Sequence, residues 1–476
     1  MVAGCLMLSL AGCTALTPRH AEPLAVDVPA GWSVTDVSAP AGSASLAQWW
    51  LRFDDPLLAG LVARALQANT SVNSAQAALR QARALRDVAA AGLLPTVGAS
   101  ASAQHNTSGA NNTGNNAGNS SGNRFNAGLD ANWELDIFGA NRSALRASEA
   151  AAQASAASLG DVQVSIGAEV ALDYIALRGA QARLAIAADN LASQQETLQI
   201  TQWRLQAGLV TSLETEQARA SVEQTRALLP ALQTSIEQSR HALAVLTGQP
   251  PAALSAQLAA TGPMPKAADD LVLSFPAETL RQRPDVRAAE LQVTAALARV
   301  SQADAARMPS FKLGGSLGLS ALTLGALTSG ASVISSLLAS VTLPVFDGGG
   351  LRAQVRGQEA ALDQASLAYK AVVLTALKEV EDALVALCGD RDRLLGLQNA
   401  AGAAANASLM ARQRYGSGLV DFQTVLETQR TQLSTQDSVA SAGADLGADH
   451  VRLYKALGGG WRPDAAGADD TPTPHS

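Results

Sequence analysis

Metal centres and hydrolases place histidine, cysteine, serine or carboxylate side chains at short, characteristic spacings. No His-x-x-His, Cys-x-x-Cys, Gly-x-Ser-x-Gly or phosphate-loop pattern occurs in this sequence. The five histidines lie far apart, at His20, His105, His241, His450 and His475. The sequence therefore predicts no catalytic, cofactor or metal site, and we expect the protein not to be an enzyme.

Cys13 is the residue whose setting predicts a chemical modification. The first 12 residues are apolar and end in Leu-Ala-Gly immediately before it, which is typical of a secretory signal with small residues at its cleavage site. The segment also resembles the lipobox of bacterial lipoproteins, in which cleavage leaves an acylated cysteine at the new N-terminus. We therefore expect a lipid anchor at Cys13 and a free thiol at Cys388, and Thr14, in place of aspartate, favours the outer membrane by the same resemblance.

This signal segment is short and lacks a basic start, which a start codon assigned too late would explain. An ordinary apolar N-terminus with a chance cysteine is the alternative.

The composition indicates long helices rather than a large compact core. Of 476 residues, 47% are hydrophobic but only 4% are aromatic and 16% charged, and the formal net charge is -7. Small side chains let helices approach closely, which fits a coiled-coil-like assembly. A negative charge without a basic cluster argues against nucleic acid as a partner.

Three separated blocks of sequence recur 210 residues later. Glu169-Val170 recurs as Glu379-Val380, Gly208-Leu209-Val210 as Gly418-Leu419-Val420, and Leu246-Thr247-Gly248 as Ala456-Leu457-Gly458. Chance similarity would not keep one offset across three blocks. We therefore expect an internal duplication, with the break in the Gly/Pro-rich stretch 248–265.

Each half should contain two long helices. Residues 141–205 contain no proline and carry leucine at every seventh position from Leu177 to Leu205, a repeat that keeps one stripe on one face of a supercoiled helix. At about 1.5 Å per residue this helix would be roughly 95 Å long. A second helix should follow Gly208, with a seam from Val222 to Leu246 and a kink at Pro230. An ordinary helical bundle would show the same stripes.

A hairpin should precede each long helix. Residues 125–135 alternate strictly between apolar and polar side chains, and residues 97–103 form an earlier strand. The polar run 106–123, rich in Asn, Gly and Ser, should be the loop between them. In the second half, residues 311–319 alternate in the same way and residues 337–345 form the return strand.

The hairpins predict a membrane barrel built from several chains. No charged residue occurs from Leu313 to Phe346. A transmembrane helix is the competing interpretation, but the Gly and Ser content, Pro344 and the alternation favour strands of about 9 to 11 residues. Four strands cannot close a barrel, and lipid offers no partner for open edges. A dimer would leave a lumen filled by side chains, whereas the twelve strands of a trimer would leave a water-filled pore.

Longer motifs resemble one family. Residues 280–290, Leu-Arg-Gln-Arg-Pro-Asp-Val-Arg-Ala-Ala-Glu, are similar to the Arg-Pro-Asp-Val-x-x-Ala-Glu signature of NodT-type lipoproteins, the TolC-like outer-membrane factors of resistance-nodulation-division efflux systems. Residues 229–232, 243–248, 133–139 and 344–349 also resemble that family, and the resemblance extends from Trp49 to Trp461. Pro284 followed by Asp285 would equally suit an ordinary helix start.

The resemblance implies a mixed fold of α-helices and transmembrane β-strands: a homotrimer whose twelve-stranded outer-membrane barrel continues into a periplasmic α-helical tunnel. It implies passive export of small amphiphilic compounds, with a periplasmic adaptor and an inner-membrane resistance-nodulation-division pump as partners. The adaptor should meet the helix turns at Gly208-Leu209 and Gly418-Leu419. The same duct could serve metal-ion efflux or protein secretion, and a coiled-coil envelope lipoprotein without a pore is the structural alternative.

On this basis the chain divides into six parts. These are a signal peptide (1–12), a lipid-anchored segment (13–55), a first repeat with an equatorial helix, hairpin and helix pair (56–248), an equatorial linker (249–275), a second repeat (276–458) and a flexible tail (459–476).

The second helix turn also carries the candidate gate. The resemblance places Glu427, nine residues after Gly418, in an acidic ring that narrows the closed tunnel, with Gln423 where an apolar neighbour is common. Asp421 is better explained as a helix N-cap. Its repeat mate, the residue 210 positions earlier in the first repeat, is Thr211, which begins a Thr-x-x-Glu capping box. The alternative for Glu427 is an ion pair with Arg430 on a solvated face.

Overall fold

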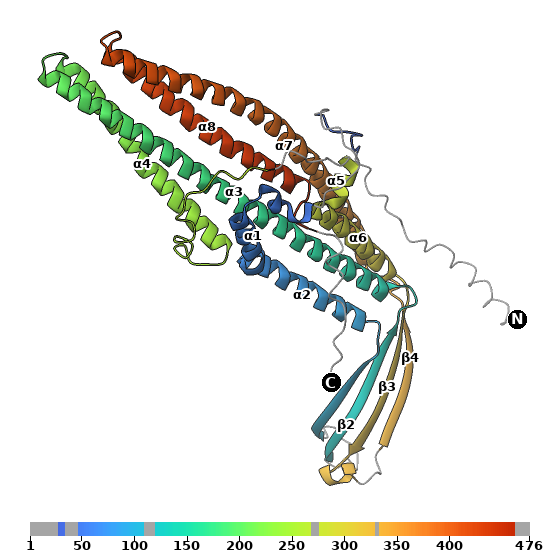
Figure 1. Ribbon diagram of the computed structural model, residues 1–476. Coiled ribbons are helices and arrows are strands. Elements are labelled where there is room, and N and C mark those ends of the chain that lie inside the picture. Colours follow the sequence, from blue (N-terminus) through green and yellow to red (C-terminus); the bar gives the residue numbers. More distant parts are fainter. Residues whose placement is uncertain (1–26, 34–45, 109–119, 268–275, 329–332, 462–476) are drawn as a thin grey trace. The chain divides into compact units, whose positions relative to one another are not determined.

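The computed structural model describes residues 27–33, 46–108, 120–267, 276–328 and 333–461 (Figure 1). The predicted signal peptide, Cys13 and most of the predicted tail lie outside the described residues.

The two halves of the chain fold into the same elements. The first half contains α1 (Pro56–Ala68), α2 (Thr70–Ala91), β1 (Thr96–Ser108), β2 (Ser120–Leu135), α3 (Ala140–Gln206) and α4 (Ser212–Leu246). The second contains α5 (Pro276–Gln282), α6 (Pro284–Ala305), β3 (Ser310–Ala321), β4 (Val333–Thr342), α7 (Gly350–Gly416) and α8 (Phe422–Ala456) (Figure 1). Helices α3 and α7 have 67 residues each, and α4 and α8 have 35 each. Because each pair starts 210 residues apart, the predicted internal duplication is confirmed.

Contacts among the described residues gather into two compact units, and the ranges given for each refer to its described residues. The first unit comprises residues 79–154 and 289–369 and contains the sheet. The second comprises residues 26–78, 155–288 and 370–476 and contains the turns between the long helices. Among the helices of the described ranges, none combines the length and the apolar character needed to cross a bilayer.

Strands β1 to β4 form one antiparallel sheet in chain order (Figure 1). All four predicted strands are present, but several predicted boundaries were wrong, including the start of β4, which is Val333 and not Leu337. Strands β1 and β2 extend into the polar run that we expected to be loop, reaching Ser108 and starting at Ser120, because backbone pairing continues whatever the side-chain polarity. Within the single chain, strand β4 ends at Thr342 and not at Val345, because its partner β3 begins at Ser310, directly opposite Thr342.

The core of the second unit is aromatic at its centre. Trp49, in the short 3-10 helix η2 (Leu46–Phe53), packs against Trp50, Phe53 and Tyr454 with ring centroids 5.8, 6.1 and 5.4 Å away. The Gly460 N–H donates a hydrogen bond to the Leu46 carbonyl at 2.9 Å. The segment before α1 and the residues after α8 are therefore packed against each other.

In each half, a side chain near the start of the second helix donates a hydrogen bond to the last turn of the fourth helix. Asn69 Nδ2 donates to the Leu246 carbonyl at 2.9 Å, and Arg283 Nη1 donates to the Ala456 carbonyl at 2.8 Å. The two accepting carbonyls belong to repeat mates, Leu246 and Ala456. Arg283 of the Arg-Pro-Asp-Val motif therefore makes the same hydrogen bond in the second half that Asn69 makes in the first.

Asn69 and Arg283 are both buried, but only Arg283 carries a charge. Its guanidinium forms ion pairs with Asp285 and Glu379, each at 2.7 Å. Burial lowers the pKa of this guanidinium, but its hydrogen bonds to the carboxylates of Asp285 and Glu379 and their negative charges raise it, and the net shift is upward. The side chain therefore stays charged and holds the start of α6 against α7 and the end of α8.

The heptad leucines are not the innermost residues of α3 near its C-terminal end. Leu198 is half-buried and Leu205 is 37% exposed, so the expectation of a leucine seam along the whole helix was wrong there. The buried positions of this stretch are polar: Asn190, Gln194, Thr197 and Thr201. Two of them bond to α8: Asn190 Nδ2 donates to Gln436 at 2.8 Å, and Gln429 Nε2 donates to Thr197 at 2.9 Å.

Candidate functional site

The sheet has one mainly apolar face and one mainly polar face; in β4 the exceptions are Ile334 and Leu338, which lie on the polar face, and Ser335, which lies on the apolar face. The register places on one face Val97, Ala99, Ala101 and Ala103 of β1, Phe125, Ala127, Leu129, Ala131, Trp133 and Leu135 of β2, Phe311, Leu313, Leu317 and Leu319 of β3, and Val333, Leu337, Ala339 and Val341 of β4. In a single chain Leu337 is 80% exposed and Val341 is 63% exposed. A contiguous open apolar surface of this kind needs lipid or another apolar cover.

The polar face is hydrogen-bonded across the strands. Ser100 donates to the Asp130 carboxylate at 3.1 Å, Asn126 donates to Ser102 at 3.2 Å, and Lys312 Nζ lies 3.6 Å from Glu134. Charges of both signs are present, and each of these bonds joins neighbouring strands. Such a face suits contact with water rather than with lipid.

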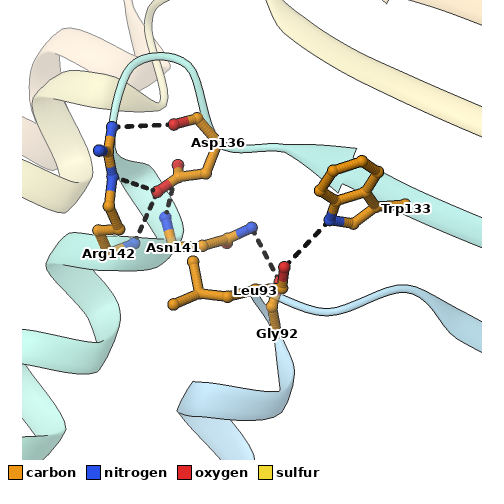
Figure 2. Close-up of polar contacts among 6 residues, drawn as sticks. All are labelled: Gly92, Leu93, Trp133, Asp136, Asn141 and Arg142. Atoms are coloured by element: carbon orange, nitrogen blue, oxygen red, sulfur yellow. Dashed lines mark hydrogen bonds and ion pairs between the residues drawn. The ribbon is translucent and has the colours of Figure 1, made fainter.

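Strand β2 is joined to α3 by a hydrogen-bonded turn (Figure 2). Asp136 accepts hydrogen bonds from the backbone N–H of Asn141 at 3.0 Å and of Arg142 at 2.9 Å, and the Arg142 guanidinium lies 3.1 Å from the same carboxylate. Trp133 Nε1 donates to the Leu93 carbonyl at 3.0 Å, and Asn141 Nδ2 donates to the Gly92 carbonyl at 3.2 Å. The turn before β1 and the turn after β2 are thereby held together.

Asp347 supports the start of α7 in the same way. It accepts hydrogen bonds from the N–H groups of Gly349 at 2.9 Å and Leu351 at 2.7 Å, and these bonds lower the pKa of its carboxyl. The preceding residues Val345 and Phe346 are 91% and 92% exposed. An apolar pair left this open on one chain indicates contact with another surface.

The turns between the long helices have matching geometry. Gly208 and Gly418 both adopt φ +73°, a left-handed conformation that favours glycine. The N–H groups of Leu209 and Leu419 donate to carbonyls five residues back, those of Arg204 and Arg414, at 2.9 Å each, which is the Schellman helix ending. Both leucine side chains are 73% exposed. The four predicted tip residues therefore form two equivalent loops, each with an exposed leucine.

The predicted cap residues lie at the N-termini of the helices that follow. Thr211 is the N-cap of α4, and its backbone N–H donates to Glu214 at 2.6 Å. Asp421 is the N-cap of α8 and accepts a hydrogen bond from the Thr424 N–H at 2.9 Å. Bonds from the Thr424 hydroxyl and backbone lower the pKa of the Asp421 carboxyl. The Asp421 carboxylate is therefore engaged in the turn.

Gln423 and Glu427 lie one turn apart on the exposed side of α8, opposite the buried Val425 and Leu426. Within the described part of the chain, the Glu427 carboxylate has no hydrogen bond or ion pair, and it forms none with Arg430. The alternative in which Arg430 holds Glu427 is thus not observed. The role of Glu427 and Gln423 at a constriction stays a prediction.

Sequence reasoning missed an apolar group beside the first turn. Trp203 is 60% exposed and Leu213 is 63% exposed, and both lie close in sequence to the exposed Leu209. The repeat mate of Trp203 is Gln413, so the two turns differ in chemistry although their backbones match. The sequence contains a signal for this difference, because Trp203 is aromatic and its repeat mate Gln413 is polar.

Arg204 ties the two helix ends together at the turns. Its guanidinium lies 4.4 Å from the centre of the Tyr415 ring and donates to the carbonyls of Tyr415 at 3.2 Å and Gly416 at 3.0 Å. The end of α3 and the end of α7 are therefore linked directly.

The remaining candidates for chemistry are isolated. Cys388 is exposed with a free thiol, and Cys13 lies outside the described residues. In the ranges that the structure covers, no group of three His, Cys, Asp or Glu side chains could hold a metal ion.

Comparison with known proteins identifies relatives that match along nearly the whole chain. The model of the outer membrane efflux protein family matches residues 61–249 and 275–459. The pyoverdine export outer membrane protein OpmQ of Pseudomonas putida is 33% identical over 467 residues, covering 97% of this chain and 97% of its own. Nodulation protein T of Rhizobium leguminosarum bv. viciae is 32% identical over 461 residues, covering 97% and 93%.

Solved structures agree with these matches. The outer-membrane channel OprN has a TM-score of 0.86 and 36% identity, covering 92% of this chain and 98% of its own. CusC, from a study of transmembrane channel formation, has a TM-score of 0.81 and 25% identity, covering 92% and 98%.

Proposed function

The chain belongs to the outer membrane efflux protein family, and from that premise we propose how copies of it close into an export duct and dock to their partners. The protein is the outer-membrane channel of a tripartite efflux pump and not an enzyme.

We propose that three copies close one barrel, because the four-stranded sheet of one chain has two open edges. In chain order β1 and β4 are its two edges, and in lipid every backbone N–H and C=O at these edges needs a partner. Three copies supply twelve strands, enough to surround a water-filled lumen, whereas two copies would leave it filled by side chains. The apolar face then meets lipid, and the polar face with Asp130, Glu134 and Lys312 lines the passage.

The cargo we propose is the class of small amphiphilic compounds, driven through by an inner-membrane resistance-nodulation-division transporter. OpmQ is named for pyoverdine export. Met, Cys and His are the side chains that soft metal ions prefer; in the described strands His105 is the one such residue, and alternation places it on the face opposite the polar one. Metal-ion cargo is therefore the less favoured alternative.

The helix turns are the proposed contact with a periplasmic adaptor protein. Leu209 and Leu419 are highly exposed at two loops of equal geometry, and exposed apolar side chains on a regular scaffold mark protein interfaces. Leu209→Asp with Leu419→Asp should reduce co-purification of the adaptor at least about tenfold and abolish efflux. The variant should still assemble, because neither side chain is buried.

Gln206→Asp is the matched control for the Leu209→Asp substitution of that variant. It adds the same charge to the first turn without removing an apolar side chain, since Gln206 is exposed at the end of α3. Unchanged adaptor recovery in the double leucine variant would show that the contact lies elsewhere.

Anchoring at Cys13 is the other part of the proposal. Cys13→Ala should lose incorporation of radiolabelled palmitate, because the acyl chain would have no thiol to occupy. Equal labelling of variant and wild type would rule out the anchor.

A further inference from the structure

The two strands that lead into the long helices end differently in a single chain. At the end of β2, Trp133, Glu134 and Leu135 pair only with β3, opposite Leu313, Lys312 and Phe311, because β1 begins at Thr96 opposite Asn132. The corresponding residues after β4 are 343–345, and within the described ranges no strand pairs with them. Leu343 is 52% exposed and Val345 is 91% exposed.

The repeat relation holds for the hairpins residue by residue. Helices α2 and α6 both have 22 residues and start 214 residues apart, as do β1 and β3, while α3 and α7 start 210 apart. Under these two shifts the pair Thr96 and Asn132 becomes Ser310 and Thr342, which are observed opposite each other. The two hairpins therefore share one internal register.

We propose that β4 pairs with β1 of the next copy in the same register that joins β2 to β3 within the chain. Leu135 lies opposite Phe311 within the chain. The residue 210 positions after Leu135 is Val345, and the residue 214 positions before Phe311 is Val97. The proposal therefore places Val345 opposite the partner subunit's Val97. In the same ladder Leu343 lies opposite the partner subunit's Ala99, and Ser340 lies opposite the partner subunit's Ser102. The inference rests on trimeric closure of the barrel.

The side chains are compatible with this register. Val345, Leu343 and Val341 would continue the apolar face of the partner subunit's Val97, Ala99 and Ala101, and a slip by one residue would turn these three side chains to the polar face. A slip by two residues keeps the faces, so the internal repeat is what selects between these registers.

The position of Pro344 and the length of the proposed ladder are compatible with the observed strands. Pro344 lies beyond the last residue of β4 that pairs with β3, so its missing N–H removes no hydrogen bond to that strand. The ladder would run from Val345 to Ile334 against residues 97–108, a length similar to that of the β2–β3 ladder.

Engineered disulfides in the full-length protein test the register. Directly opposite residues in an antiparallel pair have Cα atoms about 4.5 to 5.5 Å apart, within disulfide range, whereas a shift of two residues exceeds about 7 Å. In a Cys388→Ser background, Ser340→Cys with Ser102→Cys should convert most of the protein into covalent dimers and trimers after mild oxidation. Ser340→Cys with Ser100→Cys, and Ser340→Cys with Gln104→Cys, should give less than about a tenth of that yield.

The single variants Ser340→Cys and Ser102→Cys control for Cys5 and Cys13, which remain in every variant. Stronger cross-linking in either shifted pair would overturn the register while leaving the trimer intact. Absence of cross-linking in all three pairs, with a trimeric mass in detergent, would show that β4 and β1 of neighbouring copies do not meet. A monomeric mass would instead contradict trimeric closure itself.

Discussion

Replacing Arg283 with leucine is expected to destabilise the folded protein by about 3 to 5 kcal/mol. The side chain is buried, with 8% of its surface exposed, and it holds Asp285, Glu379 and the Ala456 carbonyl together. Leucine would leave two carboxylates and one carbonyl without their shared donor. The apparent melting temperature, followed by far-UV circular dichroism in detergent, should fall by roughly 5 °C or more. Less of the variant should reach the outer membrane.

Two further variants separate the charge from the geometry. Arg283→Lys keeps the charge but loses the planar fork, so an intermediate loss is expected. Arg307→Leu removes an exposed ion pair with Asp304, whose side chains are 41% and 39% exposed, and should cost less than about 1 kcal/mol. If Arg283→Leu melted like Arg307→Leu, the buried cluster would have no special role in closing the second repeat.

Glu427→Gln is expected to lower the cation preference of the open channel by about twofold or more. A trimer places three copies of this carboxylate around one axis, and in the described part of the chain no partner neutralises it. Glutamine has nearly the same shape, so the helix and the assembly should be unchanged. The measurement is the single-channel conductance and the ion selectivity in planar bilayers at neutral pH.

Asp421→Asn is the matched control, six residues earlier on the same helix. Asn still caps α8, and the Asp421 carboxylate is already bonded to Thr424, so conductance and selectivity should stay at wild-type values. Wild-type behaviour of Glu427→Gln would mean that Glu427 is a surface residue and that the constriction is formed elsewhere.

Most of the fold could be predicted because two signals repeat along the sequence. Alternation with period two located all four strands, and the constant offset between recurring blocks revealed the duplication. The ends of the strands were harder to predict from the sequence, because a strand ends where its partner strand ends. Thr342 ends β4 because of where Ser310 lies, and that is a tertiary fact.

The candidate site was predicted in part. Gly208 and Gly418 could be recognised because a left-handed helix ending favours glycine. The buried polar residues Asn190 and Thr197 could not be predicted, because an amphipathic heptad suggests that leucine is innermost, and the hydrogen bonds of these two side chains to another helix are made with Gln436 and Gln429 of α8. The equivalence of Asn69 and Arg283 was also hidden, because two different side chains reach the same carbonyl.

Trimeric closure can be tested by the mass of the detergent-purified protein, determined by light scattering with the detergent contribution removed. We expect a value near three times the 48.6 kDa of one chain, because twelve strands from three copies pair every edge and leave a water-filled pore, whereas eight strands from two copies would leave the lumen filled by side chains. A stable monomer that retains its full β-sheet content would contradict it.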